Sequence, residues 1–129
     1  MSGNYYGSNA AVLIFETDGQ VQLKGRIRRG QTLVISYSPG RLPTIRDRNQ
    51  WYELWNIEAS VKFHPGGEFH QGRVFEEIRW HMYFSEIVLS IPWSATQVEM
   101  WFKNYSRLSG AEAWDSRYGQ NYWFPVEPG

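Results

Sequence analysis

The stretch from Trp114 to Phe124 carries the residue types in this chain that best suit the recognition of a sugar. It reads Trp-Asp-Ser-Arg-Tyr-Gly-Gln-Asn-Tyr-Trp-Phe and sets five aromatic rings among one carboxylate, two amides, a serine and an arginine. Aromatic faces can stack on the apolar face of a pyranose ring, while amides and carboxylates can fix the directions of its hydroxyl groups. The predicted ligand-binding residues of this stretch are Trp114, Asp115, Tyr118, Gln120, Asn121, Tyr122 and Trp123.

The same stretch is also typical of a rigid turn. Asp115 and Asn121 flank a short loop, and short polar side chains of this kind often bond to their own backbone in turns. Gly119 can adopt the positive φ that such loops require. Two interpretations therefore stay open: a structural closure of the fold, or a loop that presents one or two rings to a ligand. A single bound calcium ion at Asp115 is a weaker alternative, because calcium prefers several carboxylates.

A second candidate lies where a polar loop meets a strand, at residues 49–56. Trp51 stands at this junction, where an indole is often exposed, and Asn49 and Gln50 are hydrogen-bonding neighbours. Trp51 is therefore predicted to stack on a sugar. The alternative is an indole that folds over the open end of the domain.

Short β-strands are predicted along most of the chain by alternating apolar and polar residues with frequent turn signals. Asp18-Gly19 is a hairpin signal, and Ser85 either interrupts one strand or separates two. Helical signals are nearly absent. The expected strands cover residues 10–17, 21–28, 32–37, 52–63, 68–77, 79–91, 98–103, 111–114 and 121–126.

The same alternation predicts which side chains face the core. In residues 21–28 these are Val21, Leu23 and Ile27, and in residues 52–63 they are Trp55, Ile57, Ala59, Val61 and Phe63. Residues 104–110 are expected to form a polar turn. The last two strands are expected to pair as a hairpin with residues 115–120 at its tip. Trp80 and Trp101 are expected to pack in the core or on a sheet face.

The pattern as a whole predicts an all-β fold, an antiparallel immunoglobulin-like β-sandwich of about eight to nine strands. At 129 residues and 15.2 kDa the chain has the size of one domain. We expect a single domain over residues 10–129 after a flexible segment at residues 1–9. Seven Trp, eight Tyr and seven Phe are more rings than so small a core encloses, so several should lie at the surface.

The C-terminal stretch resembles a signature of starch- and glycogen-binding modules, Trp-Asp-Asn-Asn-x-Gly-x-Asn-Tyr. Such modules include the glycogen-targeting subunits of protein phosphatase 1 and several amylase-associated modules. The matching positions are Trp114, Asp115, Gly119, Asn121 and Tyr122, whereas Ser116 and Arg117 replace the two amides of the signature. The resemblance implies an immunoglobulin-like sandwich and the binding of an α-glucan.

Together with residues 98–104, this motif is also similar to the end of an uncharacterised group of bacterial β-sandwich proteins. Further matching positions are Tyr37, the tripeptide at residues 41–43 and the Ile91-Pro92 turn. This second resemblance extends to the whole chain and implies a fold without an activity.

Composition argues against several other classes of function. Thirteen basic and thirteen acidic residues cancel, so the chain lacks the positive field that capture of nucleic acid requires. The absence of cysteine removes disulfides, thiolate metal sites and a cysteine nucleophile. The N-terminus has no signal-peptide pattern, and no apolar run reaches the length of a membrane span. Localisation stays open between the cytoplasm and secretion without a leader.

Metal and catalytic chemistry are weakly indicated. The histidines are His64, His70 and His81, and the candidate carboxylates are Glu76, Glu77, Glu86 and Glu99. Neither set shows the tight spacing typical of a zinc site or an acid–base pair. The basic stripe Lys24, Arg26 and Arg28 is typical of a solvated strand face, with anion binding as the alternative. We expect no enzyme, cofactor or metal site.

The sequence thus predicts a non-catalytic, lectin-like carbohydrate-binding module that stacks sugars on exposed rings. The alternative is a structural or protein-interaction sandwich that self-associates through the same rings into a homo-oligomer. In that case Trp51, Trp93 and Trp123 would be buried between copies.

Overall fold

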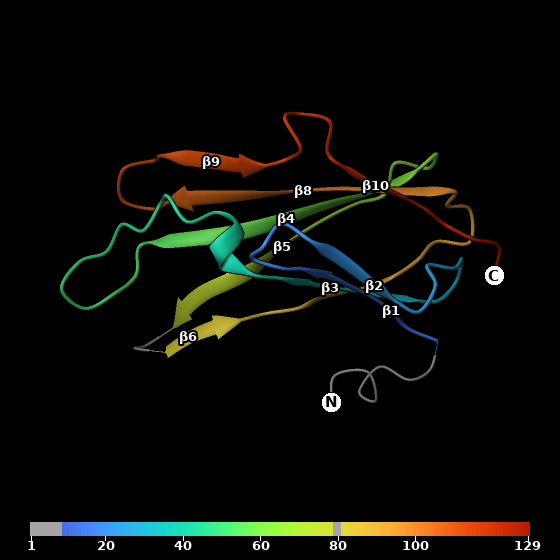
Figure 1. The fold of residues 1–129 in the computed structure, drawn as a ribbon, viewed down its shortest axis with the longest axis horizontal. Helices are drawn as coiled ribbons and strands as arrows, with labels where there is room; N and C mark the ends of the chain where they lie inside the picture. Colours follow the sequence, from blue (N-terminus) through green and yellow to red (C-terminus); the bar gives the residue numbers. More distant parts are fainter. Residues whose placement is uncertain (1–8, 79–80) are drawn as a thin grey trace.

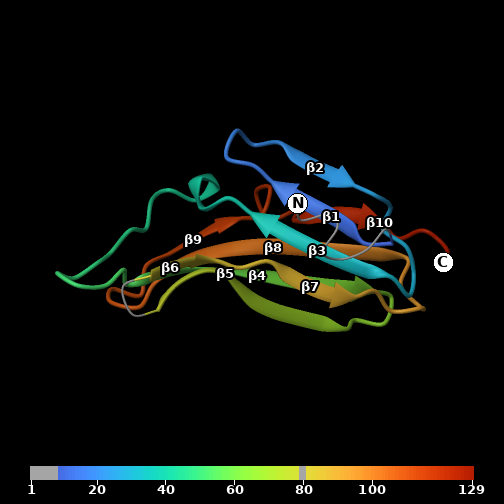
Figure 2. The same ribbon diagram turned by 90° about the horizontal axis from the view of Figure 1, so that it is seen from below.

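The chain folds into two β-sheets that lie face to face (Figures 1 and 2). The computed structural model describes residues 9–78 and 81–129, and the side chains outside residues 76–83. The four-stranded sheet has the order β2-β1-β3-β7, and the six-stranded sheet has the order β10-β8-β4-β5-β6, with β9 also paired to β8. The prediction of an all-β sandwich is confirmed. The expected segment at residues 1–9 lies outside the described residues except for Asn9.

The bounds of the elements follow the turn signals of the sequence. The four-stranded sheet comprises β1 (Ala11–Phe15), β2 (Val21–Lys24), β3 (Thr32–Tyr37) and β7 (Ile87–Ser90). The six-stranded sheet comprises β4 (Trp55–His64), β5 (Phe69–Ile78), β6 (His81–Phe84), β8 (Gln97–Ser106), β9 (Glu112–Asp115) and β10 (Tyr122–Pro125). A single 3-10 turn, η1 (Pro39–Arg41), follows β3.

The first hairpin forms as expected. β1 and β2 pair antiparallel around Asp18-Gly19, and Gly19 has a φ of 92°. β3 then pairs with the other side of β1, and this pair is parallel. The parallel pair arises because β2 returns the chain to the end of the sheet where β1 begins, so β3 starts from that same end.

The run on either side of Ser85 is two strands that belong to different sheets. β6 pairs with β5, whereas β7 pairs with β3. The chain therefore passes from one sheet to the other at this point.

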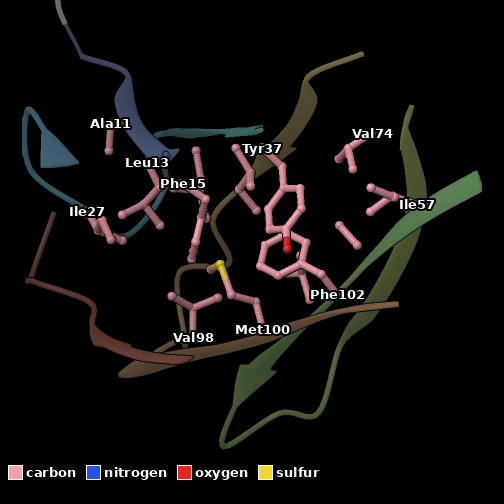
Figure 3. Close-up of a cluster of buried hydrophobic side chains, with 14 of the residues drawn as sticks. Ala11, Leu13, Phe15, Ile27, Tyr37, Ile57, Val74, Val98, Met100 and Phe102 are labelled. Carbon is pink, nitrogen blue, oxygen red and sulfur yellow. The ribbon is translucent and has the colours of Figure 1, made fainter. Parts of the chain in front are cut away.

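The core fills the space between the sheets. The inward side chains of β4 are buried as alternation predicted, with Ile57 and Ala59 fully enclosed. β8 contributes Val98, Met100 and Phe102 on its inward face. Figure 3 shows these side chains meeting residues of β1 and β3, and the ring of Tyr37 stacks on Phe102 at 4.1 Å.

Two expectations about burial and turns are wrong. Leu23 was expected to be buried but is 47% exposed, because β2 is an edge strand that reaches past the core. Residues 104–106 were expected in a polar turn but continue β8 to Ser106. Asn104 is fully buried there; its Oδ1 accepts from the backbone N–H of Ile45 at 3.2 Å, and its Nδ2 donates to the carbonyl of Asn56 at 3.1 Å.

The prediction that the last two strands pair with each other as a hairpin is also wrong. β9 and β10 do not pair with each other; each pairs antiparallel with β8, β9 along residues 102–105 and β10 along residues 97–100. Figure 1 shows them one after the other beside β8, with their connection projecting from the edge of the sheet. The reason is that the ten-residue β8 offers enough edge for both short strands in turn.

Candidate functional site

The connection between β9 and β10, residues 116–121, is a loop that leaves the sheet and returns to the same edge. Asp115 pairs with Phe102 and Tyr122 pairs with Met100, so these six residues stand opposite the single residue Trp101. We call residues 116–121 the edge loop. Its chain reversal is sharp, since Arg117 and Tyr118 have φ values of 50° and 60°.

Hydrogen bonds within the edge loop hold it in one shape. The N–H of Asn121 donates to the carbonyl of Ser116 at 2.6 Å, and the N–H of Gly119 donates to Ser116 Oγ at 3.1 Å. The indole Nε1 of Trp123 donates to the carbonyl of Gln120 at 2.9 Å. The edge loop thus has the local hydrogen bonds that the rigid-turn interpretation requires. Its residues also line a pocket on the surface.

A surface pocket of about 540 Å³ lies beside the edge loop. Its lining residues are Trp114, Asp115, Ser116, Arg117, Tyr118, Gln120 and Tyr122. Five of the eight residues predicted from the sequence are among them. Trp114 is 52% exposed and Tyr118 is fully exposed, so both rings are open to solvent.

The carboxylate of Asp115 forms the floor of this pocket. Its Oδ2 accepts from the hydroxyl of Tyr37 at 2.7 Å and from Nε of Arg41 at 2.9 Å, and its Oδ1 accepts from the hydroxyl of Tyr122 at 2.5 Å. Only 13% of the Asp115 side chain and 7% of the Arg41 side chain are exposed. Asp115 and Tyr122 therefore belong to a buried polar network and line the pocket at the same time.

Arg41 connects the two sheets through this network. One guanidinium nitrogen donates to the carbonyl of Glu16 at 2.8 Å, and another donates to the hydroxyl of Tyr122 at 2.9 Å. The guanidinium also lies over the rings of Phe15 and Tyr37, 5.4 and 5.8 Å from their centroids. The sequence pointed to Arg41 only through its place in the matching tripeptide at residues 41–43.

The network keeps its hydroxyl groups protonated. Burial and the neighbouring Asp115 carboxylate raise the pKa of Tyr37 and that of Tyr122 above their ordinary value. Burial disfavours the charged form of Arg41, but the hydrogen bond and charge of Asp115 outweigh it and raise the pKa of Arg41. The two tyrosine hydroxyls and the guanidinium therefore keep their protons through the neutral pH range, and the hydrogen bonds that they donate to Asp115 persist.

Three predicted residues lie outside the pocket. Asn121 and Trp123 border the outward surface of the six-stranded sheet, where Asn121 Nδ2 donates to Glu99 Oε2 at 2.7 Å. The ring of Trp123 stacks on His64 at 4.9 Å. Trp51 is 54% exposed, but it lies in the loop between η1 and β4, which Figure 1 places at the left end of the molecule, away from the edge loop on the upper edge.

Glu99 ties the edge loop to the outward surface. His64 Nε2 lies 2.8 Å from Glu99 Oε1, on the oxygen that Asn121 does not use. Burial opposes ionisation of Glu99, but the hydrogen bonds from Asn121 and His64 outweigh it and lower the pKa of Glu99. The side-chain N–H of Asn121 is thus used in a hydrogen bond within the protein.

The other tryptophans divide between core and surface. Trp55 is buried and stacks on Phe75 at 4.0 Å, as expected for a core residue. Trp101 is half-buried on the outward side of β8, and Trp93 is 73% exposed in the turn after β7. Trp80, Glu76, Glu77 and His81 lie outside the residues whose side chains are described.

Within the described part of the chain, no three His, Asp or Glu side chains are grouped to hold a metal ion. His64 pairs with Glu99 and His70 pairs with Glu68. In the basic stripe, Arg26 forms an exposed ion pair with Glu127 at 3.0 Å. Among the described residues there is no helix with the length and apolarity of a membrane span.

Of the comparisons with known proteins, only the comparison with protein families gives a match. No curated protein and no solved structure matches the chain. A family model spans nearly the whole sequence, in agreement with the resemblance to an uncharacterised group, and it carries no support for the starch-module resemblance. The chain belongs to the family described as a family of unknown function (DUF6209), whose model matches residues 3–127.

Proposed function

We propose that this protein binds carbohydrate, without chemical change, in the pocket beside the edge loop. The observation that carries the proposal is the pairing of two solvent-open rings, Trp114 and Tyr118, with the polar floor at Asp115. Ligand sites combine apolar walls with a few fixed polar groups, and this pocket has both. Sugars need this combination because each pyranose has an apolar face and a rim of hydroxyl groups.

The polar groups of the pocket have capacity left for a ligand. An ionised carboxylate offers about four acceptor positions, and Asp115 uses three of them within the protein, one on Oδ1 and two on Oδ2. The side-chain amide of Gln120 makes no hydrogen bond within the described structure. A sugar hydroxyl can therefore donate to Asp115 while the Gln120 amide both donates and accepts.

An array of soluble glucans, mannans and chitin oligomers tests the proposal, with tryptophan fluorescence as a second readout. Trp114→Ala should weaken binding at least about fivefold, because a stacked ring is worth about 1 kcal/mol. Trp93→Ala is the matched control, since Trp93 is an exposed indole that packs beside Gly30, away from the pocket. No signal on the array and no fluorescence change with any glycan would overturn the proposal.

Self-association is the second candidate function. It is favoured by exposed rings elsewhere on the molecule, among them Trp93 and Phe84 at 73% and 66% exposure. Trp and Tyr concentrate binding energy at protein interfaces. Light scattering separates the two functions: a stable dimer that protects Trp93 or Trp123 from quenching supports an interface, and a monomer with quenchable indoles supports the ligand site.

A further inference from the structure

The outward surface of the six-stranded sheet has an unusual mixture of side chains. We call the outward residues of β8, β9 and β10, with β4 from Glu58 and β5 up to Arg73, the outer face. None of these described positions holds Val, Leu, Ile, Met or Ala. Apart from Pro125, its apolar surface comes from the rings of His64, Phe69, Trp101, Tyr105, Trp114 and Trp123.

Three indoles form a row along this face. Trp114 pairs with Lys103 and Trp123 pairs with Glu99, so the two lie four residues of β8 apart, about 13 Å at the rise of a strand. Trp101 stands halfway between them on β8 itself. Trp114 also lines the pocket, so the row begins there and runs onto the outer face.

Two of the three indoles in the row, Trp101 and Trp123, are held in place by neighbouring rings. Trp101 stacks with Phe69 at 5.9 Å, and Trp123 stacks with His64 at 4.9 Å. Trp114 and Trp123 are 52% and 42% exposed, and Phe69 is 47% exposed. The face thus presents the rings of Trp101 and Trp123 in fixed positions, at a small entropic cost on binding.

The charges of the outer face indicate an uncharged occupant. It carries three acidic residues, Glu58, Glu99 and Glu112, and three basic residues, Lys62, Arg73 and Lys103. Glu99 bonds to His64 and Asn121, and Lys103 pairs with Glu112 at 3.2 Å. Balanced and paired charges do not attract a polyanion. Charged residues interleaved with the rings also differ from the core of a protein interface, where charges are depleted.

We infer that the outer face binds a neutral oligosaccharide chain of three or more pyranose rings. One end of the chain occupies the pocket at Trp114, and the following rings lie over Trp101 and Trp123. The inference rests on the proposed function and extends it from a single sugar to a chain. Several weak stacking contacts along one chain raise the affinity together, which suits a surface of separate rings.

Titration with oligomers of increasing length tests the inference. The probes are glucose oligomers linked α-1,4 or β-1,4 and N-acetylglucosamine oligomers, each from one to six rings. In at least one series the Kd should fall about fivefold for each ring added up to three. The three series distinguish an α-glucan from a ribbon-shaped β-linked chain.

Variants separate the outer face from the pocket. Trp101→Ala and Phe69→Ala should each weaken binding of the five-ring oligomer about fivefold and leave binding of the single sugar unchanged. Trp114→Ala should weaken both, and Trp93→Ala should weaken neither. Thermal unfolding of each variant checks that the sheet is intact, and Phe69→Ala serves if Trp101→Ala does not fold.

The outcomes distinguish the two proposals. Equal affinity for one ring and for six overturns the chain-binding inference and leaves the pocket in place. No binding in any series overturns both. A dimer that dissociates on Trp101→Ala or Phe69→Ala assigns the outer face to self-association and also overturns the inference.

Discussion

Arg41 donates from Nε to Oδ2 of Asp115 at 2.9 Å, and this contact joins the turn after β3 to the end of β9. Both side chains are nearly buried. Arg41 also donates to the carbonyl of Glu16, after β1, and to the hydroxyl of Tyr122 in β10. Asp115 also accepts from the hydroxyls of Tyr37 in β3 and of Tyr122. The pair therefore fixes the pocket floor and the packing of the two sheets at once.

Loss of the Arg41 side chain should be strongly destabilising. Arg41→Met leaves Asp115 as a buried charge without its cation, so the free energy of unfolding should fall by about 3–5 kcal/mol. Arg26→Met is the matched control, because the Arg26–Glu127 pair is exposed and should contribute at most about 1 kcal/mol. Urea unfolding measures both; equal losses for the two variants would contradict the role of Arg41.

Tyr37 should contribute to stability in a pH-dependent way. Its pKa is raised in the folded state, so its contribution is complete below the ordinary value of 10.0 and declines as the pH rises above it. The difference in unfolding free energy between wild type and Tyr37→Phe should therefore shrink on the alkaline side of 10.0. Urea unfolding across this range measures it, and a difference that does not change with pH would exclude the mechanism.

Glu99 should show the opposite dependence. Its pKa is lowered in the folded state, so its contribution is complete above the ordinary value of 4.5 and is lost as the pH falls below it. The wild-type protein should lose its advantage over Glu99→Gln on the acid side of 4.5. Glu112→Gln controls for removal of an exposed outer-face carboxylate, and a similar acid response in that variant would refute the assignment to Glu99.

Asn121 combines a backbone role with a side-chain role, and two substitutions separate them. Its φ is 63°, which glycine adopts freely and alanine does not. Asn121→Gly should lose only the bond to Glu99, whereas Asn121→Ala should cost about 1 kcal/mol more. Thermal unfolding compares them; equal stability would mean that the backbone of the edge loop relaxes.

The alternation of apolar and polar residues predicted much of the fold, because within a strand it shows which side chains face the core. Ile57 and Ala59 face the core because successive side chains of a strand point to opposite faces of its sheet, and only one face of this sheet is covered by the other sheet. Leu23 shows the limit of this rule. The same alternation on an edge strand leaves a leucine exposed, because burial also needs a facing layer.

The pairing partners of the last two strands could not be predicted in this way. A short run such as residues 111–114 shows which side chains share a face, but the same pattern suits pairing with β10 or with β8. The choice depended on the length of β8 and on contacts between residues far apart in the chain.

For the candidate site, too, the sequence determined one part and the tertiary structure decided the other. The sequence by itself determined the rings, the amides and the carboxylate of residues 114–124, and a number of aromatic residues too large for the core. Only the tertiary structure decided that Asp115 meets Arg41 and Tyr37, 74 and 78 residues away, and that Trp101 stands between Trp114 and Trp123. Side-chain chemistry is a property of each residue, whereas a site requires neighbours that strand pairing brings together.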